Sequence, residues 1–419
     1  MNKYKYIAWN DDELLTHRIY EEPPESTMCR RDPFQRDRDR IIHSRAFRRM
    51  MHKTQVFNPN KGDHYRNRLT HTLEVSQIAR SIGKVLGLND ELIEAIALGH
   101  DLGHTPFGHV GERTLDDILW QGMPEANIEP IKENFKHNFQ SLEVIDHLET
   151  RCSEYTGINL TLAVREGIIK HTKVKRNQGK NFIVYTDLNM DGIDLNLPSF
   201  TVEAQVVAIA DEIAQCTHDL EDGVRSGIIE FSPLISMPLV KECINEYKVK
   251  VNPAASSLAY ETRSQIIKNL VGFLIEDVCR ESSKNILHCS KSLEEFRESP
   301  VQLIEFSDNI KSMEKELMKW MVDKIISSEE VSIADAKAEY FIRHIFRAFF
   351  EHPLELPDYV LSKYLCRDNN ISNYSRSKID IKTLQDDPAF RRTIANHIAG
   401  MTDQYAARLY KKLYYPDYI

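Results

Sequence analysis

GHDLGHTPFGHVGE, residues 99–112, is the stretch that decides the fold, since it crowds three histidines and two acids into fourteen positions. The eight residues before it, ELIEAIAL at 91–98, carry apolar side chains at helical spacing and predict a helix that runs toward His100. His100 and His104 are four residues apart, so they share a helix face if that helix persists. The stretch therefore predicts ionisable groups carried by a helical scaffold.

The second half of this stretch predicts a turn. Gly103 and Pro106 interrupt the helical pattern and bring His109 and Glu112 back toward the first two histidines. A histidine beside a carboxylate is a poised proton donor, because the carboxylate raises its pKa and fixes its orientation. Few cores could bury five such groups, so the stretch indicates a site rather than packing.

Helical periodicity continues on both sides of this stretch. Gly87 ends one helix, and Asn89 or Asp90 can cap the next. Apolar side chains at helical intervals predict further helices over 32–49, 69–86, 112–120, 138–148 and 201–225, several more from 231 onward, a polar break at 366–382 and a final helix containing HIAGMTDQYAARLYKKL. With only 16 Gly and 16 Pro in 419 residues and few alternating β-branched runs, the chain is predicted to be all-α.

Composition excludes several classes of protein. The 54 Lys and Arg against 63 Asp and Glu give a net charge of −9, which argues against a general nucleic-acid coat protein. A hydrophobic content of 42% is typical of a globular chain, with room for two or three domains or one large helical one. The chain lacks an apolar run long enough for a membrane span and its first residues are polar, so a cytoplasmic location is expected. Seven scattered cysteines without a C-x-x-C pair indicate neither a disulfide framework nor a thiolate zinc site.

Four side chains form a candidate metal-ligand set: His71, the adjacent His100 and Asp101, and Asp211. A mixed set of imidazoles and carboxylates suits one divalent ion such as Mn, Mg, Fe, Co, Ni or Zn, with water filling the remaining positions. A metal with open positions lowers the pKa of bound water and polarises a phosphoryl oxygen. The set therefore predicts metal-assisted hydrolysis of a phosphoester or phosphoanhydride.

At this point the residues resemble a known family. The H…HD…D set is similar to that of the HD-domain metal-dependent phosphohydrolases, a mostly helical superfamily. Within it, RDRDRIIHSRAFRRMMHKTQVF at 36–57, HDLGHTPFGHVGE at 100–112 and AGMTDQYA at 399–406 resemble the bacterial dGTP triphosphohydrolase-like enzymes. The resemblance implies three regions: a helical segment at 1–65 that contributes to the active site, a metal-binding core at 66–230, and a C-terminal helical region at 231–419 that packs on the core and makes oligomer contacts.

The resemblance also implies a reaction and a catalytic set. The family hydrolyses a deoxynucleoside triphosphate to deoxynucleoside and intact triphosphate, so the attack is on the α-phosphorus. The resemblance implies three catalytic residues near the α-phosphate. His104 is similar to a catalytic histidine in vertebrate relatives, and His109 and Glu112 resemble a histidine and an acid that work as a pair in bacterial relatives. His137 matches a further phosphate-facing histidine.

Substrate contacts implied by the resemblance are Gln55 and Asp219 at the deoxyribose 3′-hydroxyl and Arg68 at the α-phosphate. Arginine's fork suits a phosphate. One position departs from the family pattern, because Gln215 stands four residues after Asp211, where relatives usually carry a tyrosine that packs on the sugar. An amide has no such apolar face. It can hydrogen-bond a ribose 2′-hydroxyl, which would relax the selectivity for the deoxy sugar, or it can reach solvent or a neighbouring helix.

One segment interrupts the helical pattern. In GKNFIVYTDLNMDGIDLNLP, residues 179–198, Phe182, Val184 and the Asp-Gly pair at 191 and 192 predict a short strand pair or an ordered loop that would act as a flap. Basic residues at positions 170, 173, 175, 176 and 180 precede it. They form either a funnel for an anionic nucleotide or a solvated loop.

The resemblance implies a dNTP substrate, a nucleotide or single-stranded DNA effector, and a homo-oligomer, a hexamer in some family members. Two alternatives stay open. One is an HD-type phosphatase or 5′-nucleotidase that removes phosphate from nucleoside monophosphates or hydrolyses an alarmone or cyclic dinucleotide. The other is a regulatory protein that senses nucleotides or single-stranded DNA with little turnover. The base preference and the native metal are not readable from the sequence.

Overall fold

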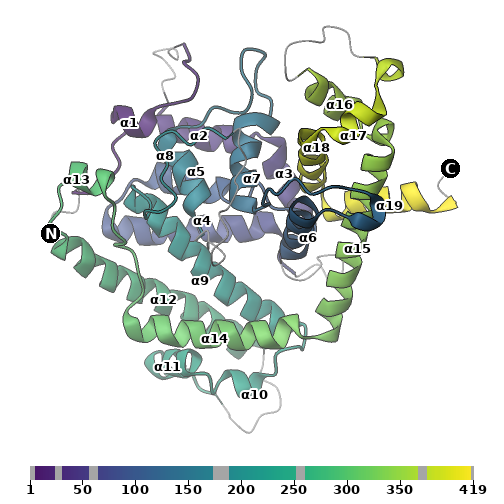
Figure 1. The fold of residues 1–419 in the computed structure, drawn as a ribbon. Coiled ribbons are helices and arrows are strands. Elements are labelled where there is room, and N and C mark those ends of the chain that lie inside the picture. Colours follow the sequence, from purple (N-terminus) through teal and green to yellow (C-terminus); the bar gives the residue numbers. More distant parts are fainter. Residues whose placement is uncertain are drawn as a thin grey trace.

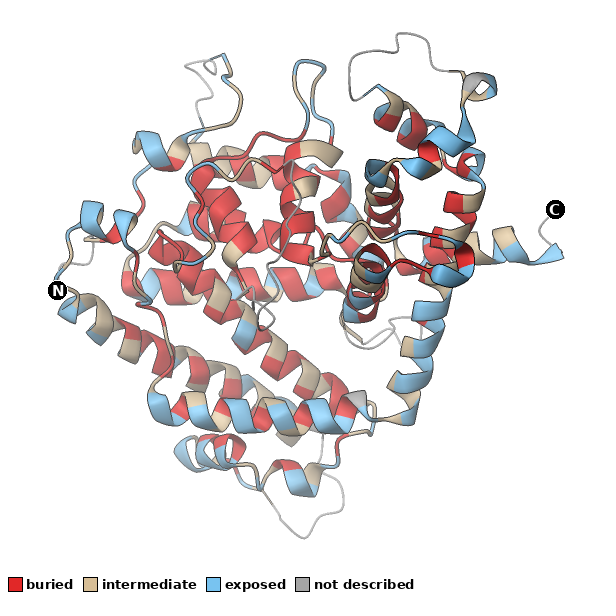
Figure 2. Cartoon of the chain, viewed as in Figure 1, coloured by how far each residue is buried: buried red, intermediate tan, exposed pale blue. Residues whose placement is uncertain are grey.

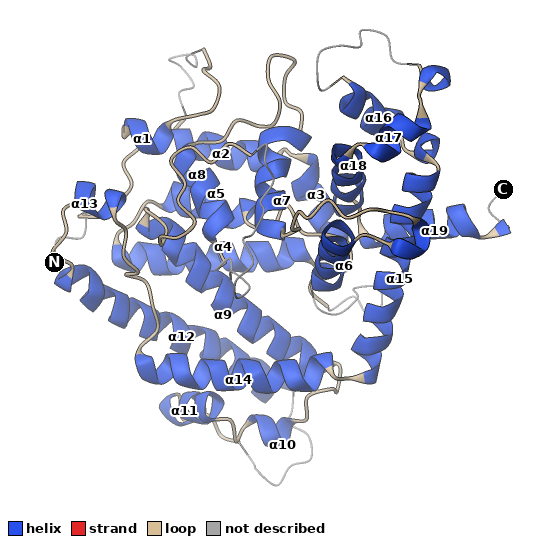
Figure 3. Ribbon diagram, viewed as in Figure 1, coloured by secondary structure: helices blue, strands red, loops and turns tan. Residues whose placement is uncertain are grey.

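The computed structural model describes residues 5–23, 31–55, 65–172, 188–251, 260–366 and 375–416. Within these ranges the chain is all-α, which confirms the predicted fold class (Figure 3). Extended segments in the described ranges pair only as isolated β-bridges, such as the one between Arg18 and Thr161.

The first half of the chain supplies the helices around the predicted ligands. They are α1 (Glu13–Thr16), α2 (Pro33–Ile42), α3 (Arg45–Arg49), α4 (Arg68–Leu86), α5 (Asp90–Gly99), α6 (Gly108–Gln121), α7 (His137–Glu143), α8 (Leu162–Lys170) and α9 (Val202–Arg225). The second half supplies α10 (Phe231–Leu234), α11 (Pro238–Glu246), α12 (Tyr260–His288), α13 (Leu293–Glu298), α14 (Asp308–Ile326), α15 (Glu329–Glu351), α16 (Asp358–Leu365), α17 (Ile381–Asp386), α18 (Pro388–Ala399) and α19 (Asp403–Tyr414).

Local capping fixes the ends of the helices that carry the site. Asn67 caps α4 in a reciprocal pair with Thr70, and α4 ends at Gly87 in the left-handed region with φ of 74°. Asn89 accepts hydrogen bonds from the amides of Glu91 and Leu92 and so begins α5, as the sequence predicted. Each cap satisfies amides that the helix itself leaves unpaired, which sets the register of the residues one or more turns further on.

Two predicted helices are interrupted, and these predictions were wrong in their extent. The segment 32–49 is not one helix, because Ser44 lies in an extended conformation and caps a second helix, α3, through the amide of Phe47. The final helix is also two, since α18 ends at Ala399 and Thr402 caps α19 through the amide of Tyr405. The helix at 138–148 begins at His137 and continues as a π-helix over Val144–Leu148.

The predicted flap lies partly outside the described residues, as do Phe182 and Val184 and the basic residues at positions 173, 175, 176 and 180. Its described part, residues 188–198, is a loop with a turn at Asp191 and Gly192. Of the basic residues, Lys170 is described, and its ammonium is 2.7 Å from Glu166 with its side chain 8% exposed. Lys170 is therefore engaged inside the fold.

The buried apolar residues form two clusters. The larger joins α4, α5, α8 and α9 at the centre to α12 and α14 below them in the view (Figures 1 and 2). The smaller joins α6 to α15 and α18, and Leu115, Ile118 and Leu119 are the α6 residues within it. In Figure 1 the long helix α15 connects α14 to this second group. The division of the chain at residues 65 and 230 stays a prediction.

Among the described residues, the helices are all too short or too polar to cross a membrane.

Candidate active site

The four predicted metal ligands converge from three helices. His71 lies in the first turn of α4, His100 and Asp101 directly follow α5, and Asp211 lies in α9. Ligand atoms of His71, His100 and Asp101 all lie within 4.8 Å of one another, and all three residues are buried. Asp211 Oδ1 is 3.0 Å from His71 Nε2 and 3.7 Å from His100 Nε2. These contacts bring the whole set together at one point.

The end of α5 fixes which nitrogen His100 presents to this group. Its Nδ1 donates to the carbonyl of Ala97 at 2.6 Å, so Nδ1 carries the hydrogen and Nε2 holds a lone pair. That Nε2 is buried and has no hydrogen-bond partner in the described part of the chain. A buried imidazole nitrogen without a partner, beside a second imidazole and two carboxylates, fits a divalent cation.

Both carboxyl groups of the set are held in the ionised form. Burial alone would raise the pKa of Asp211, but the adjacent imidazoles of His71 and His100 outweigh it and lower the pKa. Burial also opposes ionisation of Asp101, while the neighbouring histidines and the Arg68 guanidinium, 2.8 Å from Oδ2, hold its pKa well below the usual range. Ionised carboxylates are the form that binds metal.

A relay behind His71 orients its ring, and the sequence analysis missed its members. His71 Nδ1 is 3.1 Å from His218 Nδ1, and His218 Nε2 is 2.6 Å from Glu74. If His218 Nε2 donates to Glu74 and His71 Nδ1 donates to His218 Nδ1, then His71 Nε2 keeps its lone pair and can bind a metal. Hydrogen-bond partners behind metal-binding histidines commonly fix the ring in this way. Burial and the neighbouring His71 imidazole lower the pKa of His218 to about 4, although the hydrogen bond to Glu74 acts to raise it. The sequence signal existed, because His218 lies seven residues after Asp211 and shares its helix face.

The chain turns after Asp101, and this turn places His104. The helix does not persist past Gly99, so His100 and His104 do not share a helix face. His104 Nε2 instead lies 3.2 Å from Asp101 Oδ1. Its ring stacks on His137 with centroids 3.9 Å apart and lies 5.5 Å from the ring of His109. The turn therefore brings His104 and His109 together, and His137 joins them from the start of α7.

Glu112 is bonded to His137. Its Oε2 is 2.5 Å from His137 Nδ1, and its Oε1 accepts from Lys136 at 2.9 Å. The pairing with His109 that the resemblance implied is not among the hydrogen bonds of Glu112 in the described ranges. Burial acts to raise the pKa of Glu112, but His137 and Lys136 hold it well below its usual range.

His171, which the sequence analysis also missed, completes a second group that could hold a metal. His171 Nδ1 donates to the carbonyl of Ile168 at 2.6 Å, and burial lowers its pKa to about 3, so its Nε2 is a bare acceptor. This nitrogen lies 3.2 Å from His137 Nε2. Ligand atoms of Asp101, His137 and His171 lie within 4.8 Å of one another. The contact between two Nε2 atoms needs a proton on His137 or a cation between them.

The predicted substrate-binding residues surround this centre with unsatisfied polar atoms. Arg68 is buried, and its Nε and Nη2 have no hydrogen-bond partner in the described residues. Gln55 Oε1 and Asp219 Oδ1 are likewise buried without a partner there. Burial and the repulsion of Asp222 and Asp211 raise the pKa of Asp219 to about 8. Gln215 lies between Asp211 and Asp219, one helical turn from each, and is partly exposed.

The C-terminal AGMTDQYA segment acts on the site through Asp403. One oxygen of Asp403 accepts from the amide and the hydroxyl of Thr54, and the other accepts from the amide of Phe107 at 2.9 Å. Thr54 precedes Gln55, and Phe107 precedes the helix that carries His109. The buried Asp403 carboxylate therefore joins two loops that carry predicted site residues.

A helical fold with two imidazoles and two carboxylates gathered at one point defines an HD-domain phosphohydrolase. The family model "HD domain" matches residues 68–215, and "Phosphohydrolase-associated domain" matches residues 304–412. The chain belongs to the deoxyguanosinetriphosphate triphosphohydrolase-like proteins of this class.

Relatives with that name cover almost the whole chain. The one from Rickettsia felis is 38% identical over 401 residues, which is 94% of this chain and 94% of the relative. The one from Rickettsia rickettsii is 38% identical over 407 residues, 96% of each chain. The one from Brucella ovis is 35% identical over 404 residues, 93% of this chain and 91% of the relative.

Proposed function

We propose that this protein is a deoxynucleoside triphosphate triphosphohydrolase, which converts a dNTP and water to deoxynucleoside and intact triphosphate. The observation that carries the proposal is the arrangement of His71, His100, Asp101 and Asp211 beside a second, hydrogen-bonded group of histidines. The name of the relatives supports a nucleoside triphosphate as substrate and makes dGTP the first to test.

The proposed site holds one divalent ion on His71, His100, Asp101 and Asp211, and the lone pair of His100 Nε2 fits that role. When bound, the ion lowers the pKa of water and polarises the phosphoryl oxygen. Its identity among Mn, Mg, Fe, Co, Ni and Zn stays open. In the proposed reaction, water attacks the α-phosphorus, the bond to the 5′-oxygen breaks, and that oxygen takes up a proton.

The residues around the ligands divide the remaining work in this proposal. Arg68 offers its unpaired Nη2 to the α-phosphate, where a guanidinium neutralises developing charge. His104 is our first candidate for the donor to the leaving 5′-oxygen. His104 stacks on His137, and His137 in turn is bonded to Glu112, so these side chains and the exposed His109 can exchange protons with the site.

We place the sugar of the substrate beside Gln55 and Asp219, whose buried oxygens lack hydrogen-bond partners in the described residues. In the proposal, the 3′-hydroxyl donates its one hydrogen to Asp219 Oδ1, which is buried and has no partner in the described residues, and accepts from the side-chain amide of Gln55. Gln215, one turn from Asp219, faces the 2′-position and admits a ribose. A Gln215→Tyr variant is then expected to raise the ratio of deoxy to ribo turnover, and an unchanged ratio would show that Gln215 does not face the sugar.

The test is product analysis. Metal-loaded protein is incubated with each dNTP and its ribo counterpart, singly and in mixtures, and the products are separated by anion-exchange chromatography. The proposal expects deoxynucleoside and triphosphate from the wild type and no product from Asp211→Asn. The matched control, Glu212→Gln, changes the adjacent exposed carboxylate and should retain activity.

Other outcomes of this assay would favour the HD-type phosphatase or the nucleotide-sensing regulatory protein instead. Inorganic phosphate from a nucleoside monophosphate, pyrophosphate from an alarmone, or a linear dinucleotide from a cyclic dinucleotide would indicate the HD-type phosphatase alternative. Binding of nucleotide or single-stranded DNA without any product in mixtures would indicate the sensor. The homo-oligomer and the effector implied by the resemblance stay predictions, as does the cytoplasmic location expected from the composition.

A further inference from the structure

Arg66 precedes α4, and its guanidinium reaches three carboxylates. Its Nε donates to Glu74 at 3.0 Å, its Nη2 donates to Glu221 at 2.6 Å, and its Nη1 donates to Asp222 at 3.3 Å. Glu74 lies on α4, whereas Glu221 and Asp222 lie on α9. One side chain therefore spans the two helices that supply the first and the last of the predicted metal ligands.

The contact of Arg66 with Glu74 leads to a predicted metal ligand. Glu74 Oε1 accepts from Arg66, and Glu74 Oε2 lies 2.6 Å from His218 Nε2, so the two oxygens have different partners. His218 Nδ1 in turn lies 3.1 Å from His71 Nδ1. The side chain of Glu74 is 42% exposed, and a half-exposed carboxylate has several rotamers open to it. The bond from Arg66 therefore favours the rotamer that reaches His218.

The contact of Arg66 with Asp222 leads to the predicted sugar contact. Asp222 is buried and lies three residues after Asp219, on the same side of α9. Arg66 is the only ion-pair partner of Asp222 among the described residues. The carboxyl groups of Asp222 and Asp219 repel each other, and the Arg66 guanidinium attracts both. Arg66 therefore stabilises this turn of α9 against the start of α4.

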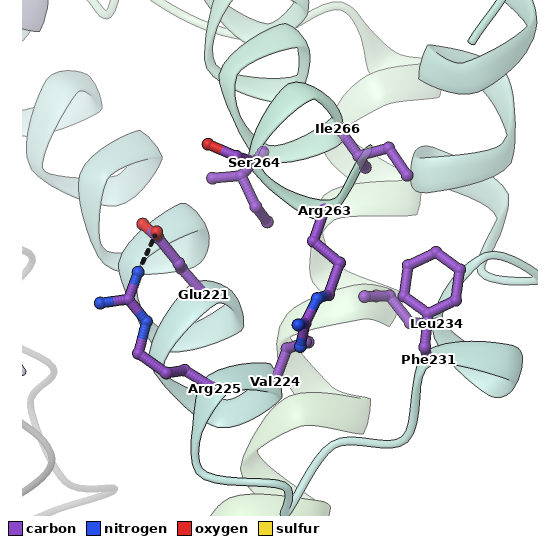
Figure 4. Close-up of a pocket in the computed structure, with 9 residues that line it drawn as sticks. Glu221, Val224, Arg225, Phe231, Leu234, Arg263, Ser264 and Ile266 are labelled. Atoms are coloured by element: carbon purple, nitrogen blue, oxygen red, sulfur yellow. Dashed lines mark hydrogen bonds and ion pairs between the residues drawn. The ribbon is translucent and has the colours of Figure 1, made fainter. Parts of the chain in front are cut away.

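The third carboxylate, Glu221, has two arginine partners. It lines the pocket of about 430 Å³ between α9, α10 and α12, where it also pairs with Arg225 at 3.1 Å (Figure 4). Arg225 lies one turn further along α9, so this pair stays within a single helix. The bond from Arg66, in contrast, joins α9 to α4.

Arg80 is a second arginine of α4 that joins two helices, but it has no link to the site. It donates to Asp90 at 2.7 Å and lies 3.5 Å from Glu94, which joins α4 to α5. Neither acid is bonded to a predicted site residue in the described part of the chain. Arg80 therefore provides a comparison in which an arginine between helices is purely structural.

We propose that Arg66 is a positioning residue that couples metal binding to recognition of the sugar 3′-hydroxyl. Through Glu74 it fixes the ring of His71, so that the Nε2 of His71 faces the proposed ion. Through Asp222 it keeps Asp219 where the sugar is proposed to bind. The sugar half of this proposal rests on the proposed function, whereas the metal half requires only that the chain binds a divalent metal.

Calorimetric titration of the metal-free full chain with Mn²⁺, without nucleotide, tests the metal half. Arg66→Met removes all three bonds and should raise the Kd for Mn²⁺ by about ten- to a hundredfold, the usual effect of losing an outer partner of a metal ligand. Glu74→Gln should raise it similarly. Arg66→Lys should recover part of the affinity, because an ammonium still reaches one carboxylate. Arg80→Met, the matched control, should bind Mn²⁺ as the wild type does.

The ratio of kcat/KM for dGTP to kcat/KM for its 3′-deoxy analogue tests the sugar half. Arg66→Met and Asp222→Ala should each lower this ratio by about tenfold, the effect of one hydrogen bond to a charged group. Glu74→Gln and Arg80→Met should keep the ratio, and Asp222→Ala should keep the affinity for Mn²⁺. A merely structural role of Arg66 would lower the unfolding midpoint without this division of the two readouts.

The proposal is overturned if Arg66→Met binds Mn²⁺ as Arg80→Met does, if Glu74→Gln leaves the Kd unchanged, or if neither Arg66→Met nor Asp222→Ala lowers the sugar ratio. Arg66→Lys takes the place of Arg66→Met in these comparisons if the latter does not fold. Failure of the proposed function gives a different result. A wild type that binds Mn²⁺ but releases no triphosphate from dGTP overturns the sugar half, and the titration alone then decides the metal half.

Discussion

Replacing Asp403 with asparagine tests how far the C-terminal segment supports the site. The carboxylate accepts three hydrogen bonds, two from Thr54 and one from the amide of Phe107. Asparagine has one acceptor oxygen. If that oxygen keeps the Thr54 bonds, the amide group of the new side chain faces the Phe107 amide, and two donors meet at a position where the native distance is 2.9 Å.

The magnitude follows from these three bonds. A hydrogen bond to a charged group contributes about 1.5–3 kcal/mol, and a neutral acceptor gives roughly half of that. Losing one bond and halving two predicts that Asp403→Asn lowers the free energy of unfolding by about 3–6 kcal/mol. Because Thr54 and Phe107 adjoin Gln55 and the start of α6, we also expect kcat/KM for a dNTP to fall by more than the loss of folded protein explains.

The assay is urea unfolding followed by circular dichroism, together with triphosphate release. Asp386→Asn, at an exposed aspartate in the same region, is the matched control and should change the unfolding free energy by less than about 0.5 kcal/mol. An Asp403→Asn protein that unfolds at the same urea concentration as the control and retains full turnover would refute the reasoning.

Three further predictions concern stability. Glu22 lies 2.5 Å from Arg40 and 2.6 Å from Arg36. Burial opposes its ionisation, but its hydrogen bonds outweigh burial and lower its pKa from 4.5 to about 2. The ionised Glu22 therefore stabilises the fold fully above pH 4.5, and this stabilisation is lost as the pH falls toward 2. Glu22→Gln should cost about 3 kcal/mol at pH 7 and flatten acid unfolding, unlike Glu21→Gln. A Cβ on Gly103 would lie 2.1 Å from the amide nitrogen of Ser141, so Gly103→Ala should lower the free energy of unfolding by about 3 kcal/mol. Gly272→Ala in α12, where a Cβ has room, should leave that free energy unchanged or raise it, as measured by calorimetry. Chelation should abolish turnover and lower the melting temperature, and divalent metal should restore both.

The sequence predicted the helices and the ligands for different reasons. Helices such as α4, α5 and α9 follow from apolar periodicity and from capping residues that act within a few positions. His100 and Asp101 lie close together because they are consecutive in the sequence. That His71 and Asp211 join them could be expected only through the family resemblance, because no local signal states which helices pack together.

The interruptions of the predicted helices had weak local signals. Ser44 caps α3, but Phe47 stands where a capping box would have a glutamate or glutamine. Gly400 and Thr402 between α18 and α19 were a clearer signal, since glycine ends helices and threonine begins them. An apolar stripe that continues across such a break conceals it.

His171 was the residue that sequence reasoning could least have found. It follows α8, and its neighbour Lys170 drew attention only as one of a run of basic residues. Its place beside His137 is created by the packing of α7 on α8, which joins residues 34 positions apart in the chain. Tertiary contacts of this kind have no signature in the spacing of a single sequence.

The packing of α6 makes the C-terminal helices part of the support of the candidate site. His109 and Glu112 lie on α6, yet the apolar side of α6 belongs to the cluster built by α15 and α18, while His71, His100 and Asp211 are carried by helices of the other cluster. The candidate site thus lies where the two hydrophobic clusters meet. A substitution that shifts one cluster against the other would therefore change the distance between α6 and the proposed metal ligands without touching either, so the proposed activity should respond to changes far from the site.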